Sequence, residues 1–183
     1  MKTTIASCVH EILIALNENP AREGLEKTPQ RVEKAFLELT SGMGIKPKDI
    51  IGDAIFSTES SGMILQKNIE FYSLCEHHML PFFGVVHLAY MPNKKIIGLS
   101  KVSRIIDVLS KRLQVQENLT HEIAQNLKEI LNPKGIAVYV EAQHFCMMMR
   151  GIKKQNSTSI TTDFSGLFDE NNLKNEFFAC INK

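Results

Sequence analysis

One cysteine, one acid and three histidines fall within residues 74–87, whose sequence is LCEHHMLPFFGVVH. Most of the other side chains in this stretch are apolar, as in a buried strand. Cys75 and His78 form a C-x-x-H pair, and two intervening residues let a tight turn aim both side chains at one metal ion. The chain has no second C-x-x-C or H-x-x-H pair, which argues against a zinc finger. The pattern therefore favours part of a metal site whose remaining ligand lies elsewhere in the chain.

The remaining candidate ligands are His144 and Cys146, far along the chain. If residues 136–146 form a strand, these two side chains share a face because they are two positions apart. Three protein ligands with one open position are the pattern of a catalytic zinc site, and zinc lowers the pKa of its bound water to roughly 7. The predicted ligands are Cys75, His78 and Cys146. His77 and His144 then stay unligated, which suits proton transfer near neutral pH.

A purely structural interpretation competes with this one. A buried cysteine usually packs as a small hydrophobic residue, and for Cys146 taken alone that interpretation is preferred. It is weaker for His77 and His78, because adjacent residues of a strand point to opposite faces and cannot both be core. Some candidates have no partner at ligand spacing and are assigned no role: Cys8, Cys180, His10, His87 and His121.

The segment IIGLSKVSRIID suggests an anion site at the start of a helix. Gly98 and Ser100 precede or open the predicted helix, and Lys101 and Arg104 lie three positions apart on one face of its first turn. Basic residues there oppose the helix dipole, so the arrangement is easier to explain if an anion such as a phosphate chain binds. The alternative is a solvated basic face. Arg150 is a further cation with the same two interpretations.

Glu117 lies between two predicted helices, in RLQVQENLT. A carboxylate can accept two parallel hydrogen bonds from an N–H and an adjacent amino group, which is the edge that guanine presents. The structural alternative is an acid that interacts favourably with a helix N-terminus. Local sequence favours that alternative.

Hydrophobic periodicity predicts the elements that must position these residues. Helices are expected at 4–17, 28–39, 100–113 and 119–131. Strands are expected at 63–78 and 82–92, as a hairpin, and at 135–149, with 153–164 as a partner strand or a loop. The order indicates an α+β fold with a four-stranded antiparallel sheet, preceded by an N-terminal helical region at 1–55, with the catalytic domain at 56–183. Such a sheet has two open edges, which oligomerisation can cover.

Composition limits the partners. The 183 residues are 44% hydrophobic, with 21 basic and 20 acidic side chains. This near-balance argues against a protein that coats nucleic acid or an anionic membrane. We find no signal peptide and no apolar run of ~18 residues. A cytoplasmic location is therefore expected, where the four cysteines would stay reduced.

Taken together, CEHH, IGLSK-x-x-R, Q-x-QE, H-x-C and M-R-G closely resemble GTP cyclohydrolase I in order and separation. The N-terminal NP-x-R-EGL-x-KTP-x-R is also similar to that family, and the resemblance runs from about residue 11 to 178. It implies the tunnelling fold, with helices on the outer side of the sheet. It also implies five-membered rings that stack into a decamer, with active sites between subunits.

The implied reaction opens the imidazole ring of GTP, releases formate and forms 7,8-dihydroneopterin triphosphate, the first step towards folate or tetrahydropterins. Matched position by position, the zinc ligands are Cys75, His78 and Cys146. His77 matches the histidine that handles protons during ring opening, and His144 matches a second histidine near the purine and ribose, with Ser100 as a helper in the later steps. The pair that holds the pyrimidine edge of guanine is Gln116 and Glu117. Groups around the ribose and triphosphate are Ser100, Lys101, Arg104 and Arg150.

Two positions depart from the family pattern: Lys174 stands near a place where arginine is common, and Asp163 interrupts a threonine-rich segment. Two other functions stay open. One is another pterin- or deazapurine-handling enzyme of the same fold. The other is a nucleotide-binding scaffold with structural zinc, which predicts a fourth protein ligand such as His144.

Overall fold

The computed structural model describes residues 3–182. The chain forms two compact units, one ending at Ser41 and the other beginning at Gly42, and each is described by itself. The division into a helical region at 1–55 and a catalytic domain at 56–183 remains a prediction. None of the helices within 3–182 is both long and apolar enough to cross a membrane.

The N-terminal unit contains two helices that pack against each other, α1 (Ile5–Ala15) and α2 (Thr28–Leu39). Thr4 caps α1, since its hydroxyl accepts from the Ser7 backbone N–H while the Ser7 hydroxyl accepts from the Thr4 N–H. Pro29 lies in the first turn of α2, where its missing N–H costs nothing. Both predicted helices are confirmed.

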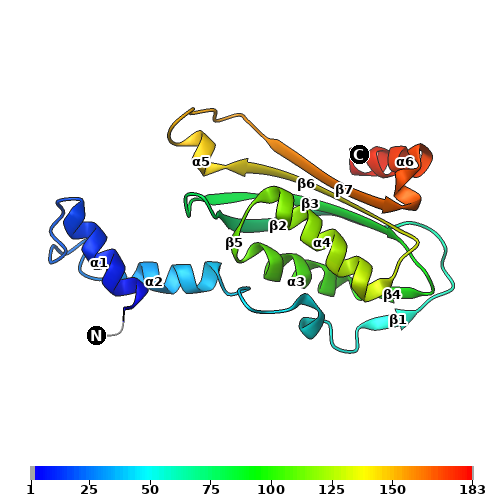
Figure 1. Ribbon diagram of the computed structural model, residues 1–183, viewed down its shortest axis with the longest axis horizontal. Helices are drawn as coiled ribbons and strands as arrows, with labels where there is room; N and C mark the ends of the chain where they lie inside the picture. Colours follow the sequence, from blue (N-terminus) through cyan, green and yellow to red (C-terminus); the bar gives the residue numbers. More distant parts are fainter. Residues whose placement is uncertain (1–2, 183) are drawn as a thin grey trace. The chain divides into compact units, whose positions relative to one another are not determined.

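The second unit is built on a five-stranded sheet in the order β5-β2-β3-β6-β7 (Figure 1). Its four long strands are antiparallel and overlap the segments expected as strands: β2 (Ile64–Cys75), β3 (Pro81–Met91), β6 (Gly135–His144) and β7 (Ser159–Gly166). The fifth strand, β5 (Leu113–Gln114), was not predicted and pairs parallel to the end of β2. A separate pair joins β1 (Ile55–Ser57) to β4 (Lys95–Ile97).

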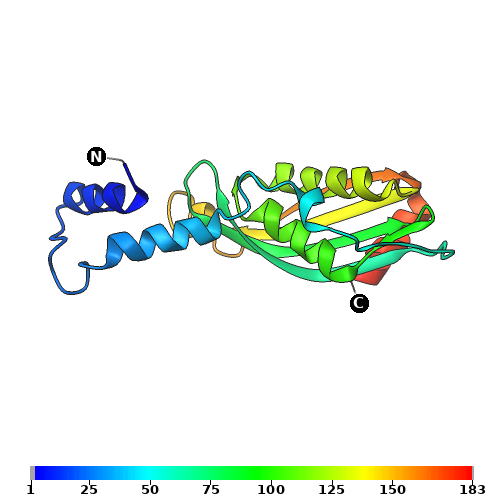
Figure 2. The same ribbon diagram turned by 90° about the horizontal axis from the view of Figure 1, so that it is seen from below.

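Two helices, α3 (Leu99–Ser110) and α4 (Gln116–Leu131), lie side by side along one face of the sheet (Figure 2). α3 packs on β2, whereas α4 packs on β6 and β7. Their apolar residues recur at helical spacing, as in Val102, Ile105 and Leu109 of α3, and these side chains are buried in the main core. The predicted helices are therefore confirmed, and α4 begins three residues earlier than expected.

A C-terminal helix, α6 (Asn171–Ile181), packs on the other face of the sheet and was not predicted. Strand alternation explains the two layers, because Leu88 and Val138 join the core under α3 and α4 whereas Ala89 and Ala137 join a second cluster. Buried members of that cluster from the C-terminal segment are Phe168, in a short 3-10 helix (Leu167–Asp169), and Phe177 of α6. Another 3-10 helix spans Pro47–Ile50.

The strand expected at 135–149 is too long. β6 ends at His144, and the next residues form a short helix, α5 (Phe145–Met148), so Cys146 is not on the strand. The reason is the loss of pairing partners. His144 pairs with Phe82 at the start of β3, next to Pro81, and β7 begins only opposite Ala142. Beyond His144, none of the strands within residues 3–182 continues alongside the backbone, so the backbone bonds locally, with the Met149 N–H donating to Phe145 O.

Candidate metal centre and active site

The CEHH segment is a tight turn between β2 and β3. The Cys75 N–H donates to Leu80 O at 2.8 Å, and the Met79 N–H donates to Cys75 O at 2.7 Å. Met79 has a φ of 53°, in the left-handed region that lets the chain reverse. The strand thus ends at Cys75, and the argument that His77 and His78 point to opposite faces of a strand is wrong. Both rings lie in the turn, with their Nδ1 atoms 3.8 and 3.9 Å from the Cys75 sulfur.

Three side chains converge beside this turn as a candidate metal centre. The ligand atoms of Cys75, His78 and Cys146 all lie within 4.8 Å of one another. Cys75 is buried, Cys146 half-buried and His78 exposed, so one side of the group is open to solvent. Among the described residues, no further histidine, cysteine or acid joins the group.

The donor chemistry of this group fits a zinc ion. Burial raises the pKa of the Cys146 thiol, and the adjacent Cys75 raises it further, whereas Arg150 lowers it. Two sulfurs held together away from water are unfavourable as thiolates unless a cation compensates them. Two cysteines and one histidine are a known donor set for zinc with an open fourth position.

His144 lies next to this group but bonds elsewhere. Its Nε2 is 2.8 Å from Oε1 of Gln116, the first residue of α4, and its ring stacks on Phe82 with a centroid distance of 4.7 Å and an angle of 2°. Burial lowers the pKa of His144, and the charge of Glu117 opposes that shift. The scaffold interpretation expected His144 as a fourth ligand, whereas its Nε2 is committed to an amide.

Glu117 and Arg150 belong to the same end of the sheet. Glu117 follows Gln116 in the first turn of α4 and is exposed, and its charge acts on His144. Arg150 is exposed just after α5, and its charge acts on Cys146. The structure therefore brings both residues close to the candidate metal centre. The sequence alone did not show that they lie at the same end of the sheet.

Ser100, Lys101 and Arg104 are not brought to this place. They open α3, and the Gln66 side-chain amide donates to the carbonyl of Leu99, the first residue of α3, at 3.3 Å. Gln66 lies nine positions before Cys75 on β2, which at ~3.3 Å per residue is roughly 30 Å. In Figure 1, α5 and β4 lie at opposite ends of the sheet. Cys146 belongs to α5, and β4 leads into α3.

The start of α3 is nevertheless suited to an anion. Ser100 and Arg104 are exposed and one turn apart, while Lys101 is half-buried. The Lys101 ammonium donates one hydrogen bond to Ile50 O at 2.9 Å, which fixes the side chain and leaves two N–H donors. We call Ser100, Lys101 and Arg104 the anion end of the sheet. The metal end consists of the residues gathered around the CEHH turn: Cys75, His77, His78, Gln116, Glu117, His144, Cys146 and Arg150.

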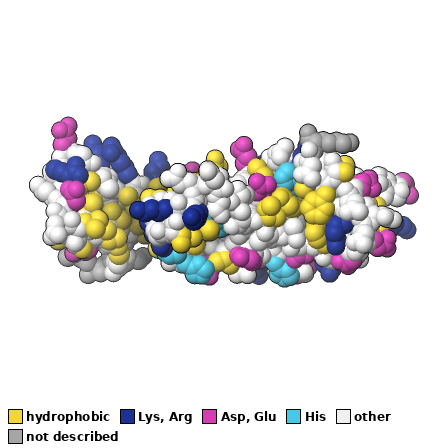
Figure 3. Space-filling view, turned by 90° about the horizontal axis from the view of Figure 1, so that it is seen from above, with side chains coloured by type: hydrophobic (Ala, Val, Ile, Leu, Met, Phe, Trp, Pro, Cys, Tyr) yellow, Lys and Arg dark blue, Asp and Glu magenta, His cyan; other side chains and the backbone are white. Residues whose placement is uncertain are grey.

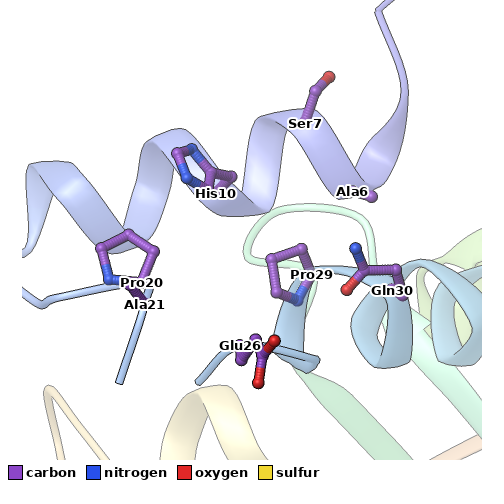
Figure 4. Close-up of a pocket in the computed structure, with 8 residues that line it drawn as sticks. All are labelled: Ala6, Ser7, His10, Pro20, Ala21, Glu26, Pro29 and Gln30. Carbon is purple, nitrogen blue, oxygen red and sulfur yellow. The ribbon is translucent and has the colours of Figure 1, made fainter. Parts of the chain in front are cut away.

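A pocket of about 510 Å³ in the second unit is lined by residues that include Pro47, Ile51 and Ile130, and none of the predicted site residues contributes to it. A shallow pocket of about 380 Å³ in the N-terminal unit is lined by residues that include His10, Glu26 and Pro29 (Figure 4), and none of the predicted site residues contributes to it. Acidic and basic side chains intermingle over the face seen in Figure 3. His121, which had no predicted role, pairs with Asp163 at 2.8 Å, and this contact gives the unusual acid in β7 a structural partner.

Comparison with known proteins decides the family. The family model described as GTP cyclohydrolase I matches residues 5–182. The chain belongs to the GTP cyclohydrolase I family. Similar proteins named GTP cyclohydrolase 1 come from Campylobacter jejuni (51% identical, covering 100% of this chain and 96% of the relative) and Leptospira biflexa (52% identical, covering 94% and 95%). At this coverage, the chain is an enzyme of the GTP cyclohydrolase I type.

One solved structure also supports the fold. The apo crystal structure of an archaeosine synthase QueF-Like matches with a TM-score of 0.50 and 17% identity, covering 59% of this chain and 97% of that one. At this identity the likeness shows the α+β fold alone. The α+β class expected from the sequence is thus confirmed for this member of the GTP cyclohydrolase I family.

Proposed function

We propose that this protein is a zinc-dependent GTP cyclohydrolase, which opens the imidazole ring of GTP with water, releases formate and forms 7,8-dihydroneopterin triphosphate. Family membership supports the reaction. The observation that carries the zinc dependence is the convergence of Cys75, His78 and Cys146 within 4.8 Å, with one side open to solvent. A scaffold with structural zinc would need a fourth ligand instead.

At the metal end, Cys75, His78 and Cys146 would hold the ion. A zinc ion there would supply Lewis-acid activation of water. His77 is next to the group yet outside it, with a side chain 64% exposed, so it can reach a bound nucleotide. We assign it proton transfer to and from the ring nitrogens of the purine during ring opening.

Guanine recognition is assigned to Glu117, whose exposed carboxylate can accept from N1–H and the 2-amino group of the purine. Gln116 was predicted to share this role, and its side chain is buried. His144, held beside the metal group, would exchange protons near the ribose in the later steps, with Ser100 as a helper. Lys101, Arg104 and Arg150 would bind the triphosphate.

The roughly 30 Å between the two ends of β2 means that one chain cannot use both ends on one GTP. A triphosphate held at the start of α3 would leave its guanine far from the metal centre of the same chain. We therefore propose that a second copy supplies the anion end, so that active sites lie between subunits. The proposed tunnelling-fold rings and decamer would meet this requirement.

Open sheet edges and exposed apolar side chains are consistent with such an assembly. Within the described residues, β5 pairs with only Leu74 and Cys75 of β2, and β7 forms the opposite edge. On the face opposite α3 and α4, Tyr72 stacks on Phe83 and is 61% exposed, and Ile160 is 56% exposed. Pairing between copies would cover these edges. We also propose that the protein is cytoplasmic and that it binds neither nucleic acid nor membranes.

The proposal is tested on one purified sample by elemental analysis together with formate release from GTP. We expect close to one zinc per chain and release of formate in proportion to the pterin formed. A metal-loaded, assembled protein that releases no formate from GTP would defeat the assigned reaction. Full turnover after exhaustive chelation would defeat the zinc dependence alone.

A further inference from the structure

The side chain of Gln116 is buried and fully engaged inside the protein. Gln116 is 2% exposed at the start of α4. Its Nε2 is 3.1 Å from Val140 O, 3.0 Å from Ser159 O and 3.1 Å from the Thr161 hydroxyl, and its Oε1 is 2.8 Å from His144 Nε2. Two amide hydrogens thus serve three acceptors, and no donor is left over for a ligand.

The surroundings fix which way this amide points. Val140 O and Ser159 O are backbone carbonyls, which only accept hydrogen bonds, so the amide nitrogen must face them. The amide oxygen must then face His144. The hydrogen-bond partners on both sides therefore fix the orientation of the amide.

A chain of hydroxyls supports the same direction. The Thr120 hydroxyl donates to Gln116 O at 2.8 Å. Thr120 and Thr161 are 2.6 Å apart, so Thr161 must be the donor in that contact because the Thr120 hydrogen is already used. The Thr161 oxygen is then free to accept from Gln116 Nε2. Each donor in this network between α4 and β7 has one consistent direction.

We propose that Gln116 is a positioning residue that fixes His144 in the Nε2–H tautomer and leaves Nδ1 as the ring nitrogen available to substrate. The amide oxygen can only accept, so His144 Nε2 must carry the hydrogen of the 2.8 Å contact. Phe82 fixes the plane of the ring by parallel stacking. This inference rests on the proposed function, and it gives the Gln116 side chain a role other than guanine binding.

The adjacent carboxylate has the opposite character. Glu117 is exposed, and no protein hydrogen bond to its side chain occurs among the described residues. The predicted pair therefore divides into one residue that contacts the nucleotide and one that acts through His144. The two residues should respond differently in kinetics: Glu117 through KM and Gln116 through kcat.

The tautomer is read directly by solid-state ¹⁵N NMR of the assembled protein, purified with its metal and labelled at histidine. The His144 signals are assigned by their absence in His144→Gln. We expect the wild-type protein to show a protonated Nε2 and an unprotonated Nδ1 at mildly alkaline pH, and Gln116→Met to lose that preference. Thr161→Val is the matched control, because it removes one partner of the amide and keeps the contact to His144. A wild-type His144 protonated at Nδ1 instead would overturn the inference, whether or not GTP is turned over.

Kinetics give a second, independent readout. Gln116→Met should lower kcat for GTP by roughly 10²-fold while KM changes by less than roughly threefold. A Gln116→Met protein with unchanged kcat and a strongly raised KM would overturn the positioning role and restore guanine binding. If the wild-type protein released no formate at all, the proposed function would fail while the NMR result still decided the tautomer.

Discussion

The two ends of β2 differ in how complete they are within one chain. At the metal end, a turn, a helix start and a short helix bring ligands and a histidine into contact, and Gln116 and Cys75 are buried. At the anion end, Ser100 and Arg104 are exposed, and only Lys101 is fixed, by a backbone carbonyl. The candidate metal ligands and His144 are therefore brought together within one protomer, whereas the cations at the start of α3 would have to be brought into place by another copy.

This difference has an energetic reason. Metal ligands must sit within a fraction of an ångström of their positions, which requires a packed and hydrogen-bonded surrounding. A triphosphate is large, flexible and highly charged, so mobile exposed cations can hold it without such support. Substitutions at the metal end should therefore affect metal content and kcat, and those at the anion end should affect KM.

The largest effect is expected for Cys146→Ser. Without the Cys146 thiolate only two of the three proposed protein ligands remain, which is too few to hold zinc. Bound zinc and GTP turnover should therefore disappear together. Metal analysis and a formate assay on the same sample check this. Cys180→Ser, in α6 and outside the metal group, is the control and should keep both. Retention of full turnover by Cys146→Ser would remove this residue from the site.

His77→Ala separates chemistry from metal binding at the same end. Because His77 lies outside the three-ligand group, zinc and nucleotide binding should persist while turnover falls by roughly 10²- to 10⁴-fold. The control is His121→Ala, which removes an exposed histidine paired with Asp163 and should leave turnover near the wild-type value. Normal turnover in His77→Ala would refute its role in proton transfer.

Arg104→Ala probes the anion end. Loss of one charge-assisted contact to the triphosphate should raise KM for GTP by roughly 10- to 100-fold, while zinc content and kcat stay close to wild type. Steady-state kinetics over a range of GTP concentrations check this, with Lys128→Ala, an exposed cation at the end of α4, as the control. A fall in zinc content in Arg104→Ala would contradict the separation of the two ends.

The smallest effect concerns His87, which belongs to neither end. It is 6% exposed on β3, its Nδ1 has no hydrogen-bond partner among the described residues, and its ring contacts Tyr139. Burial lowers the pKa of His87, and Lys67 lowers it further, whereas Glu141 raises it.

Because the folded-state pKa of His87 lies below the unfolded value, the unfolded chain binds the extra proton first, and stability is lost as pH falls below ~6.5. His87→Phe should flatten this loss, by at most roughly 1.4 kcal/mol per pH unit. Denaturant unfolding at pH ~7.5 and ~5.5 measures it. An equal acid sensitivity in the variant would show that His87 does not contribute.

The sequence predicted which three side chains come together better than it predicted the elements that carry them. C-x-x-H spacing was enough to pair Cys75 with His78, because a turn of this length acts locally. Cys146 was placed on a strand, and the end of that strand depends on where β3 and β7 stop pairing, which local sequence does not encode. Helix α6 was missed although Leu173, Phe177 and Ile181 recur at helical spacing.

The distance between the two ends could not be predicted from sequence either. Lys101 follows Cys75 by fewer residues than Cys146 does, yet it lies far away because β3 and β4 carry the chain to the other end of the sheet. The engagement of Gln116 was equally hidden, since its partners Val140 and Ser159 are backbone groups of distant strands. Periodicity identifies buried faces, whereas polar networks between elements need the assembled sheet.

The most direct test mixes two proteins that are each impaired at a low GTP concentration, one by loss of the metal centre and the other by a raised KM. Cys146→Ser keeps an intact anion end, and the double variant Lys101→Ala with Arg104→Ala keeps an intact metal end. When the two are co-assembled, roughly a quarter of the sites should combine intact ends from different copies, so formate release should recover well above the sum of the separate proteins. A mixture of Cys146→Ser with His77→Ala, both altered at the metal end, should not recover. If formate release by the first mixture at low GTP does not exceed the sum of its components, each chain works alone and the site is not shared between copies.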